Sequence, residues 1–243
     1  MAIELANHIY RDGEGVPVVL MNAYPVDHRM WDVCAKALAD FADLNDVPDF
    51  PIWAPDMAGS GASPVPSDAD SGPRMANGAY SEALDRLAGA YVDLIKAAGY
   101  EQAIWVGLSM GGYGALKCAL TYPERYAGVG SFSGVVDIRR PVYSVKTPAG
   151  AREREAIFGA GSPEGTKNDL YRLAQDVFDE KKSFPDIYLS CGEQDGLYED
   201  NVKFDAFLTT LGAKHRFDHR AGAHSWRFWN DSVEECFGYF LGK

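Results

Sequence analysis

The spacing of apolar residues along the chain alternates between two patterns. Short continuous apolar runs, bounded by Gly, Pro or polar residues, are typical of strands buried on both faces of a parallel sheet. The strands predicted from these runs, with a last one of mixed character, occupy residues 16–21, 51–55, 103–106, 126–132, 187–191 and 214–217. Between the runs, apolar residues recur at every third or fourth position, as on one face of a helix. The predicted helices occupy residues 28–41, 83–95, 111–120, 170–178, 201–211 and 228–241.

This alternation predicts the α/β class, with a mainly parallel sheet flanked by helices on both faces. Two helix boundaries carry suitable capping residues, Asp27 before the first helix and Gly99 after the second. One stretch, 137–185, interrupts the alternation and is rich in Pro and Gly. We expect it to be a cap-like insertion that covers one edge of the sheet, where loops carry binding function. The rest of the pattern indicates a single domain over residues 1–243.

Composition and charge narrow the classes of partner. Apolar residues make up 47% of the 243 residues, which suits one α/β domain. The formal net charge is −12 and Lys and Arg form no cluster, so we expect neither nucleic acid nor a membrane as a partner. The first ten residues lack the pattern of a secretory signal, which favours a cytoplasmic location with free thiols. The oligomeric state has no signature in the sequence.

Cysteine and histidine spacing does not favour a metal site. The four cysteines are far apart along the chain, and none belongs to a Cys-x-x-Cys pair. His215 and His219 form a spaced pair that would suit a metal, but we interpret them as residues of a surface strand. His8 and His28 are expected to be surface or capping residues. We therefore predict neither a metal nor an organic cofactor.

A nucleophile is predicted where a buried strand meets a helix. The pentapeptide Gly107-Leu108-Ser109-Met110-Gly111 directly follows strand 103–106 and directly precedes helix 111–120. A serine on such a sharp turn exposes its hydroxyl at the carboxyl edge of a parallel sheet. The flanking glycines have no side chain to collide with neighbouring backbone at the turn. Ser109 is therefore the candidate nucleophile.

The partners of this serine are expected downstream of it. A serine hydroxyl needs a base to accept its proton and an acid to orient that base. With the serine on a strand-to-helix turn, the acid and then the histidine follow along the chain, each after a late strand. Asp195 follows strand 187–191 and is the preferred acid, with Glu193 of the same turn as the alternative. His224 follows the last predicted strand and is the preferred base.

Two backbone N–H groups are needed to stabilise the negative oxygen that forms during nucleophilic attack on a carbonyl. One comes from Met110, after the nucleophile, and the other from the loop after the first strand. In that loop Tyr24 is the best candidate and Ala23 the second, because Pro25 has no N–H. Besides the insertion, the side chains predicted to line a substrate pocket are those of Trp31, Leu108, Tyr113 and Trp226.

Several segments in combination resemble the α/β-hydrolase superfamily. Residues 18–31 and 54–63 are similar to its oxyanion loop and to the loop after the next strand. The segments closest to one branch, the tributyrin esterases related to esterase D and S-formylglutathione hydrolase, are 107–115, 168–174, 191–195, 197–201 and 222–229. In one place the chain departs from the superfamily pattern, because Asn22-Ala23 stand where His-Gly is common.

This resemblance implies the α/β-hydrolase fold and a carboxylesterase that cleaves small-molecule esters of short acyl groups through an acyl-enzyme. By motif position it assigns the nucleophile to Ser109, the acid to Asp195 and the base to His224. The alternatives are a thioesterase or an acyltransferase with the same triad, and a non-catalytic ligand-binding protein with this fold. A binding protein has little need for all three groups in register, which argues against the last alternative.

Overall fold

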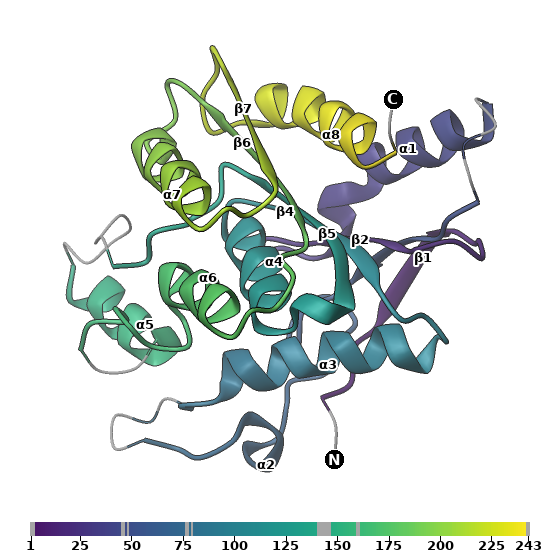
Figure 1. The fold of residues 1–243 in the computed structure, drawn as a ribbon. Coiled ribbons are helices and arrows are strands. Elements are labelled where there is room, and N and C mark those ends of the chain that lie inside the picture. Colours follow the sequence, from purple (N-terminus) through teal and green to yellow (C-terminus); the bar gives the residue numbers. More distant parts are fainter. Residues whose placement is uncertain are drawn as a thin grey trace.

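A seven-stranded sheet runs through the middle of the molecule, in the order β1-β3-β2-β4-β5-β6-β7 (Figure 1). The computed structural model describes residues 3–44, 47, 49–75, 78, 80–139, 147–158 and 161–241. The strands are β1 (Asn7–Arg11), β2 (Val18–Met21), β3 (Ile52–Pro55), β4 (Ala103–Leu108), β5 (Tyr126–Phe132), β6 (Asp186–Gly192) and β7 (His215–Arg220). Neighbouring strands are parallel except β1, which runs antiparallel to β3. The predicted mainly parallel sheet is confirmed.

Helices cover both faces of this sheet (Figure 1). They are η1 (His28–Trp31), α1 (Asp32–Leu44), α2 (Asp68–Ser71), α3 (Ala83–Ala97), α4 (Met110–Thr121), η2 (Pro123–Arg125), α5 (Pro148–Phe158), α6 (Leu170–Asp179), α7 (Tyr198–Thr210) and α8 (Trp226–Leu241), where η marks a short 3-10 helix. Residues of α1 and α8 share one core with the sheet, and residues of α3, α4, α6 and α7 share the other.

The alternation of side chains along β2 explains why its apolar run is continuous. Val19 and Met21 belong to the core formed with α3 and α4, whereas Val18 and Leu20 belong to the core formed with α1 and α8. Successive side chains of a strand point to opposite faces, so a strand covered on both sides buries every residue. β2 therefore lacks the alternating polar positions of a half-exposed strand.

Both predicted helix caps are present. Asp27 precedes η1, and its side chain accepts a hydrogen bond of 3.1 Å from the Arg29 N–H. The first predicted helix divides into this 3-10 turn and α1. Gly99 follows α3 with φ +87°, a left-handed conformation that glycine adopts without strain.

Four elements, β1, α2, the short η2 and α5, are not revealed by the sequence patterns. β1 is an edge strand with polar residues and only partial burial, so it shows no apolar run. α2 is a single turn in which the Ser67 hydroxyl accepts a hydrogen bond from the Asp70 N–H. α5 has a highly charged middle, 152–155, and so lacks a clear apolar face.

The predicted insertion, 137–185, contains α5 and α6. Leu170 of α6 lies in the core that α4 shares with the sheet, and the Tyr113 hydroxyl donates to the Asn168 carbonyl at 2.8 Å. This part of the stretch therefore belongs to the helical layer on one face of the sheet. Residues 140–146 lie outside the described residues, so the cover over the sheet edge stays a prediction.

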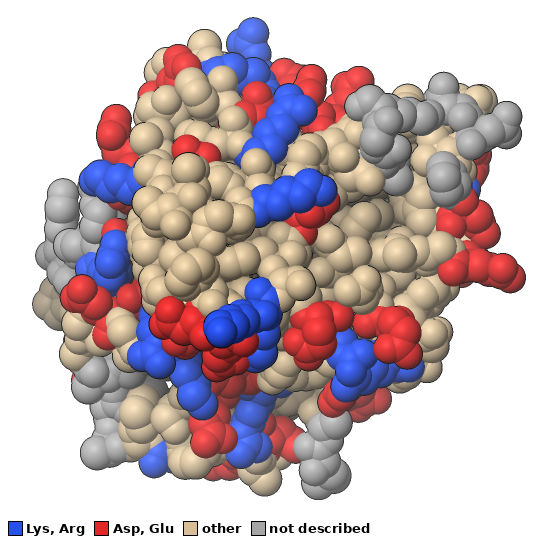
Figure 2. All heavy atoms as spheres, viewed as in Figure 1, with Lys and Arg blue, Asp and Glu red and all other residues tan. Residues whose placement is uncertain are grey.

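Figure 2 shows the acidic and basic side chains on one face of the molecule. On the face drawn in Figure 2 they lie next to each other rather than in separate patches of one sign. Some of them pair along helices, as Glu82 does with Arg86. Within the described residues, no helix has the length and apolar character needed to cross a membrane. The four cysteines are free thiols.

Candidate active site

Ser109 lies on the turn between β4, which ends at Leu108, and α4, which begins at Met110. Its backbone has φ +55° and ψ −122°, a conformation that strains a residue with a side chain. A Cβ on Gly107 would come within 2.2 Å of the Gly111 carbonyl oxygen, so the turn needs glycine at that position. The turn holds the Ser109 hydroxyl at the carboxyl edge of the sheet.

The structure brings the predicted nucleophile, base and acid together. Nε2 of His224 lies 3.1 Å from Oγ of Ser109, and Nδ1 of His224 lies 2.8 Å from Oδ2 of Asp195. The three residues follow β4, β7 and β6, whose carboxyl ends meet at one edge of the sheet. The His224 side chain is 33% exposed and Ser109 is half-buried, so small molecules can reach both.

Asp195 is a buried carboxylate that stays ionised. Its side chain is only 2% exposed. Burial by itself raises its pKa, but hydrogen bonds from His224 and from the Leu197 N–H outweigh burial and hold the pKa below its usual value. The charge of Asp195 therefore favours the imidazole tautomer with a proton on Nδ1. Nε2 is then free to accept the proton of Ser109.

Glu193, the alternative acid, faces a different histidine. Its Oε1 lies 3.1 Å from Nδ1 of His219, and both side chains are exposed. His219 belongs to β7, in agreement with the prediction that it lies in a strand. Asp195, and not Glu193, is therefore within hydrogen-bond distance of His224.

The N–H groups of Met110 and Tyr24, predicted to form an oxyanion hole, have no hydrogen-bond acceptor among the described residues, whereas the N–H of Ala23 has one. Met110 is the first residue of α4, where N–H groups have no acceptor within the helix. The Ala23 N–H donates to the sulfur of Met30 at 3.1 Å. Among the residues that the structure describes, none accepts a hydrogen bond from the Tyr24 N–H. Tyr24 is therefore better placed than Ala23 to supply the second donor.

The residues predicted to line a pocket lie at different depths. Trp31, Leu108 and Tyr113 are buried in the two cores. Trp226 is 37% exposed, packs edge-on against Trp31 with ring centroids 5.9 Å apart, and lies two residues after His224. Of the four, only Trp226 has an exposed side chain close to the catalytic residues. The other three are buried, which does not support the prediction that they line a substrate pocket.

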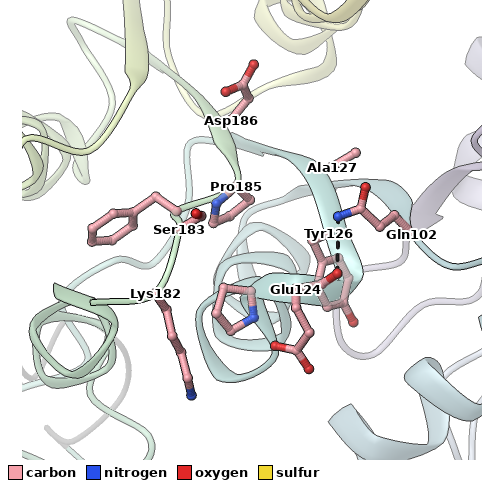
Figure 3. A pocket seen from close by; sticks show the side chains of 10 residues that line it. Gln102, Glu124, Tyr126, Ala127, Lys182, Ser183, Pro185 and Asp186 are labelled. Carbon is pink, nitrogen blue, oxygen red and sulfur yellow. Dashed lines mark hydrogen bonds between the residues drawn. The ribbon is translucent and has the colours of Figure 1, made fainter. Parts of the chain in front are cut away.

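A surface cavity of about 660 Å³ lies at the opposite end of the strands (Figure 3). It is lined by residues around the starts of β5 and β6, among them Glu124, Tyr126, Lys182 and Asp186. Ser109, at the end of β4, does not line it. This cavity is therefore separate from the candidate active site.

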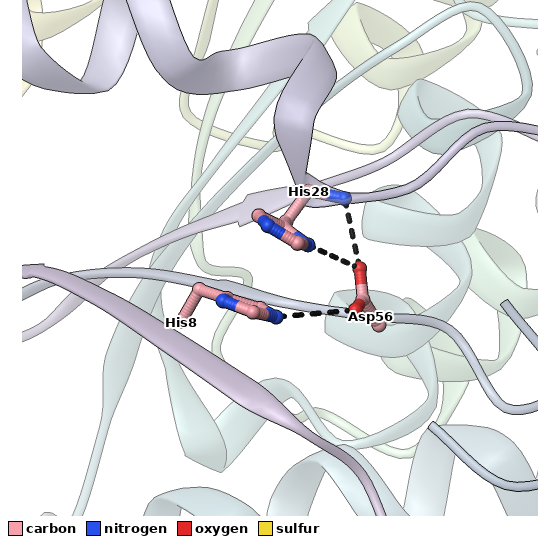
Figure 4. A group of neighbouring side chains, drawn as sticks. All are labelled: His8, His28 and Asp56. Carbon is pink, nitrogen blue, oxygen red and sulfur yellow. Dashed lines mark hydrogen bonds and ion pairs between the residues drawn. The ribbon is translucent and has the colours of Figure 1, made fainter. Parts of the chain in front are cut away.

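The loop that carries Tyr24 is anchored by a cluster that the sequence did not reveal. His8 of β1 and His28 of η1 both point at Asp56, which follows β3 and is fully buried (Figure 4). His8 Nε2 and His28 Nδ1 lie 3.2 Å and 2.9 Å from the carboxylate, which also accepts hydrogen bonds from the His28 and Ala62 N–H groups. The prediction that His8 and His28 are surface or capping residues is therefore incomplete. Their side chains also join segments that are distant along the chain.

The geometry of this cluster favours hydrogen bonds over a metal site. Two histidines and a carboxylate are a common donor set for transition metals. The two rings, however, are stacked 3.2 Å apart with only 13° between their planes, so their in-plane lone pairs run nearly parallel. Each carboxylate oxygen of Asp56 also already accepts a backbone N–H. We therefore interpret the cluster as an anchor for the loop.

Comparisons with known proteins agree with the fold. A fluorophosphonate-binding serine hydrolase of Staphylococcus aureus has a TM-score of 0.71 and 22% identity, and the match covers 95% of this chain and 86% of that one. The S-formylglutathione hydrolase of the same organism has a TM-score of 0.71 and 21% identity, with 98% of both chains covered. The protein thus has the α/β-hydrolase fold.

Family models identify the relatives more closely. The "alpha/beta hydrolase fold" model matches residues 16–144, and the "Esterase" model matches residues 85–239. The chain belongs to this esterase family, which confirms the resemblance found in the motifs. An acetyl esterase of Caldicellulosiruptor saccharolyticus is 32% identical over 136 residues, which are 54% of this chain and 51% of that protein. The match thus spans about half the length of that curated relative.

Proposed function

We propose that the protein is a serine esterase that hydrolyses small carboxylic esters with short acyl groups. The observation that carries this proposal is the continuous chain of contacts from Ser109 through His224 to Asp195, at 3.1 Å and 2.8 Å. These are the distances at which a histidine can accept the proton of a serine hydroxyl while a carboxylate orients it. Membership of the esterase family supports the same chemistry.

The reaction would proceed through a covalent acyl-enzyme. Oγ of Ser109 attacks the ester carbonyl while Nε2 of His224 takes its proton. The N–H groups of Met110 and Tyr24 stabilise the negative oxygen of the tetrahedral intermediate. His224 then gives the proton to the departing alcohol. Water then gives a proton to His224 and attacks the acyl-enzyme, and the carboxylic acid leaves as His224 returns that proton to Oγ of Ser109.

The preference for short acyl groups is supported by a relative and by one side chain near the triad. The partial match to an acetyl esterase favours small acyl groups. Trp226, partly exposed beside the catalytic loop, offers an apolar surface for either part of the ester. A series of p-nitrophenyl esters from acetate to decanoate measures this preference directly. A maximum of kcat/KM at long chains would contradict the short-acyl part of the proposal.

Replacement of the nucleophile tests the mechanism. Ser109→Ala should keep the melting temperature close to that of the wild type and lower ester turnover by at least about 10⁴-fold. The variant should also lose covalent labelling by an organophosphonate, detected as a mass increase of the intact protein. Unchanged turnover would rule out Ser109 as the nucleophile.

Acyl thioesters and an added alcohol acceptor, used beside the ester assay, separate the alternatives from the proposal. A thioesterase would cleave acyl thioesters with a clearly higher kcat/KM than the matched oxygen esters. An acyltransferase would form a new ester when a second alcohol is added, whereas an esterase would release the free acid. If the wild-type protein neither turns over any acyl substrate nor reacts with the organophosphonate, a non-catalytic binding role replaces the proposal.

A further inference from the structure

The first residue after β2, Asn22, lies against the turn that carries the nucleophile. The preceding residue, Met21, pairs with Gly107 of β4, so Asn22 follows β2 at the level where β4 leads into Ser109. A Cβ on Gly111 would come within 3.0 Å of the Asn22 carbonyl oxygen, so the two backbones approach each other closely. Asn22 is also fully buried. Its backbone is therefore fixed by packing against the nucleophile turn.

The tip of the loop after Asn22 has little packing of its own. Tyr24 is 56% exposed and Val26 is 45% exposed, so burial contributes little to the position of this tip. Within the loop, the Val26 N–H donates to the Ala23 carbonyl at 3.0 Å. The cluster of two histidines and a carboxylate holds the chain only further along, at His28. The shape of the tip therefore depends on hydrogen bonds within the loop.

The side chain of Asn22 spans this loop. Its Nδ2 donates to the Val26 carbonyl at 2.6 Å. A carbonyl oxygen can only accept, so the amide nitrogen faces Val26 and the orientation of the amide is determined. The other amide atom, Oδ1, is buried and has no donor among the described residues. A buried acceptor without a donor costs stability, which offsets what the bond to Val26 contributes. Stability alone therefore does not explain an amide at this position.

We propose that Asn22 is a positioning residue for the oxyanion hole of the proposed esterase. Its side chain joins the fixed base of the loop to the far end of the loop at Val26. Tyr24 lies between these two points, so the bond fixes the direction of the Tyr24 N–H relative to the N–H of Met110. The amide thus supplies the N–H that closes the loop at the position where the superfamily commonly has histidine. This inference rests on the proposed function, because it assigns Asn22 to the same reaction.

Asn22→Leu tests the hydrogen bond with little change in side-chain volume. It removes the N–H donor and the unpartnered Oδ1 together, and the carbonyl of the exposed Val26 can bind water instead. The melting temperature should therefore stay within about 3 °C of the wild type. The kcat for a short-chain ester should fall about ten- to thirtyfold, less than the 10²- to 10³-fold expected for complete loss of an oxyanion donor. KM should change by less than about twofold, because the oxyanion forms only after the ester has bound.

Two readouts separate a displaced oxyanion donor from a general loss of packing. Oγ of Ser109 adds to the carbonyl carbon of a trifluoromethyl ketone, its proton passes to His224, and the ketone oxygen becomes an oxyanion. The inhibition constant of such a ketone should rise by about the factor by which kcat falls. The acid limb of kcat/KM should stay at the wild-type pH, because the contacts among Ser109, His224 and Asp195 remain.

A second substitution removes the same N–H by different chemistry. Asn22→Asp keeps the shape of the side chain but places an oxygen where Nδ2 donates to Val26. It also brings a negative charge close to the developing oxyanion, so it should weaken inhibition by the ketone at least as much as Asn22→Leu. A large fall in melting temperature in both variants would assign Asn22 to the fold and overturn the inference.

Gln102→Leu is the matched control for loss of an amide donor. Nε2 of Gln102 donates to the Glu124 carbonyl at 3.1 Å, at the opposite end of the strands from Ser109 (Figure 3). This variant should keep both kcat and the inhibition constant within about twofold of the wild type. The inference is wrong if Asn22→Leu keeps wild-type kcat, or if it lowers kcat while the inhibition constant of the ketone stays unchanged. A wild type that does not react with an organophosphonate would instead refute the proposed function.

Discussion

The two sides of the candidate active site are held in place by different kinds of interaction. On the acid–base side, Asp195 is buried and receives hydrogen bonds from the partly exposed His224 and from the N–H of the buried Leu197. On the oxyanion side, the loop that carries Tyr24 is anchored through one carboxylate, that of Asp56. The imidazole rings of His8 and His28 lie within hydrogen-bond distance of it. Tyr24 itself is 56% exposed. Damage to the first side should therefore affect chemistry most, while damage to the second should affect both stability and loop geometry.

The largest effect is expected on the acid–base side. Asp195→Asn should lower kcat by about 10³- to 10⁴-fold, because a neutral amide no longer stabilises the imidazolium and can favour the wrong imidazole tautomer. Steady-state kinetics on a short-chain ester measures this loss. Glu193→Gln is the matched control, since Glu193 lies in the same turn but faces His219. If Glu193→Gln costs more activity than Asp195→Asn, Glu193 is the acid and the assignment is reversed.

The two sides also differ in how far the sequence predicts them. The Ser109 turn and its partners follow strands whose apolar runs are continuous because both faces of the sheet are covered. The order of Ser109, Asp195 and His224 along the chain, each after a buried strand, then places the three residues at the same edge of the sheet. The Asp56 cluster has no such signal, because it depends on β1, a polar edge strand that pairs with β3 only after the chain has folded.

The next largest effect is expected on the oxyanion side. Asp56→Asn removes the charge that accepts the His28 and Ala62 N–H groups. The free energy of unfolding should fall by about 1–3 kcal/mol, measured by urea denaturation. Activity should fall by about tenfold to a hundredfold, because a loosened loop misplaces the Tyr24 N–H.

Exposed Asp68 provides the control for a simple loss of charge. Asp68 belongs to α2 and its side chain is 79% exposed. Asp68→Asn should leave both stability and activity close to wild-type values. If Asp56→Asn destabilises the protein but keeps full activity at a temperature where it is folded, the cluster supports the fold without positioning the loop.

A smaller effect is expected in the pH dependence of stability. Hydrogen bonds outweigh the opposing effect of burial and hold the pKa values of Asp195 and Asp56 below their usual range. A carboxyl group with a depressed folded-state pKa stabilises the fold above its unfolded-state value, about 3.9, and this contribution is lost as the pH falls through the folded-state pKa. The stability gap between wild type and either asparagine variant should therefore narrow below about pH 4. A gap that stays constant from pH 7 to pH 3 would contradict the role of these charges.

The smallest effect is expected from the outer member of the Asp56 cluster. The His8 side chain is 36% exposed and lies on the edge strand, whereas His28 contacts Asp56 through both its ring and its backbone N–H. His8→Gln should therefore cost less than about 1 kcal/mol in unfolding free energy and change kcat by less than about twofold. The backbone donors to Asp56 remain in this variant and continue to hold the loop. A loss of activity as large as that of Asp56→Asn would mean that the paired histidines, rather than the carboxylate with its backbone donors, anchor the oxyanion side.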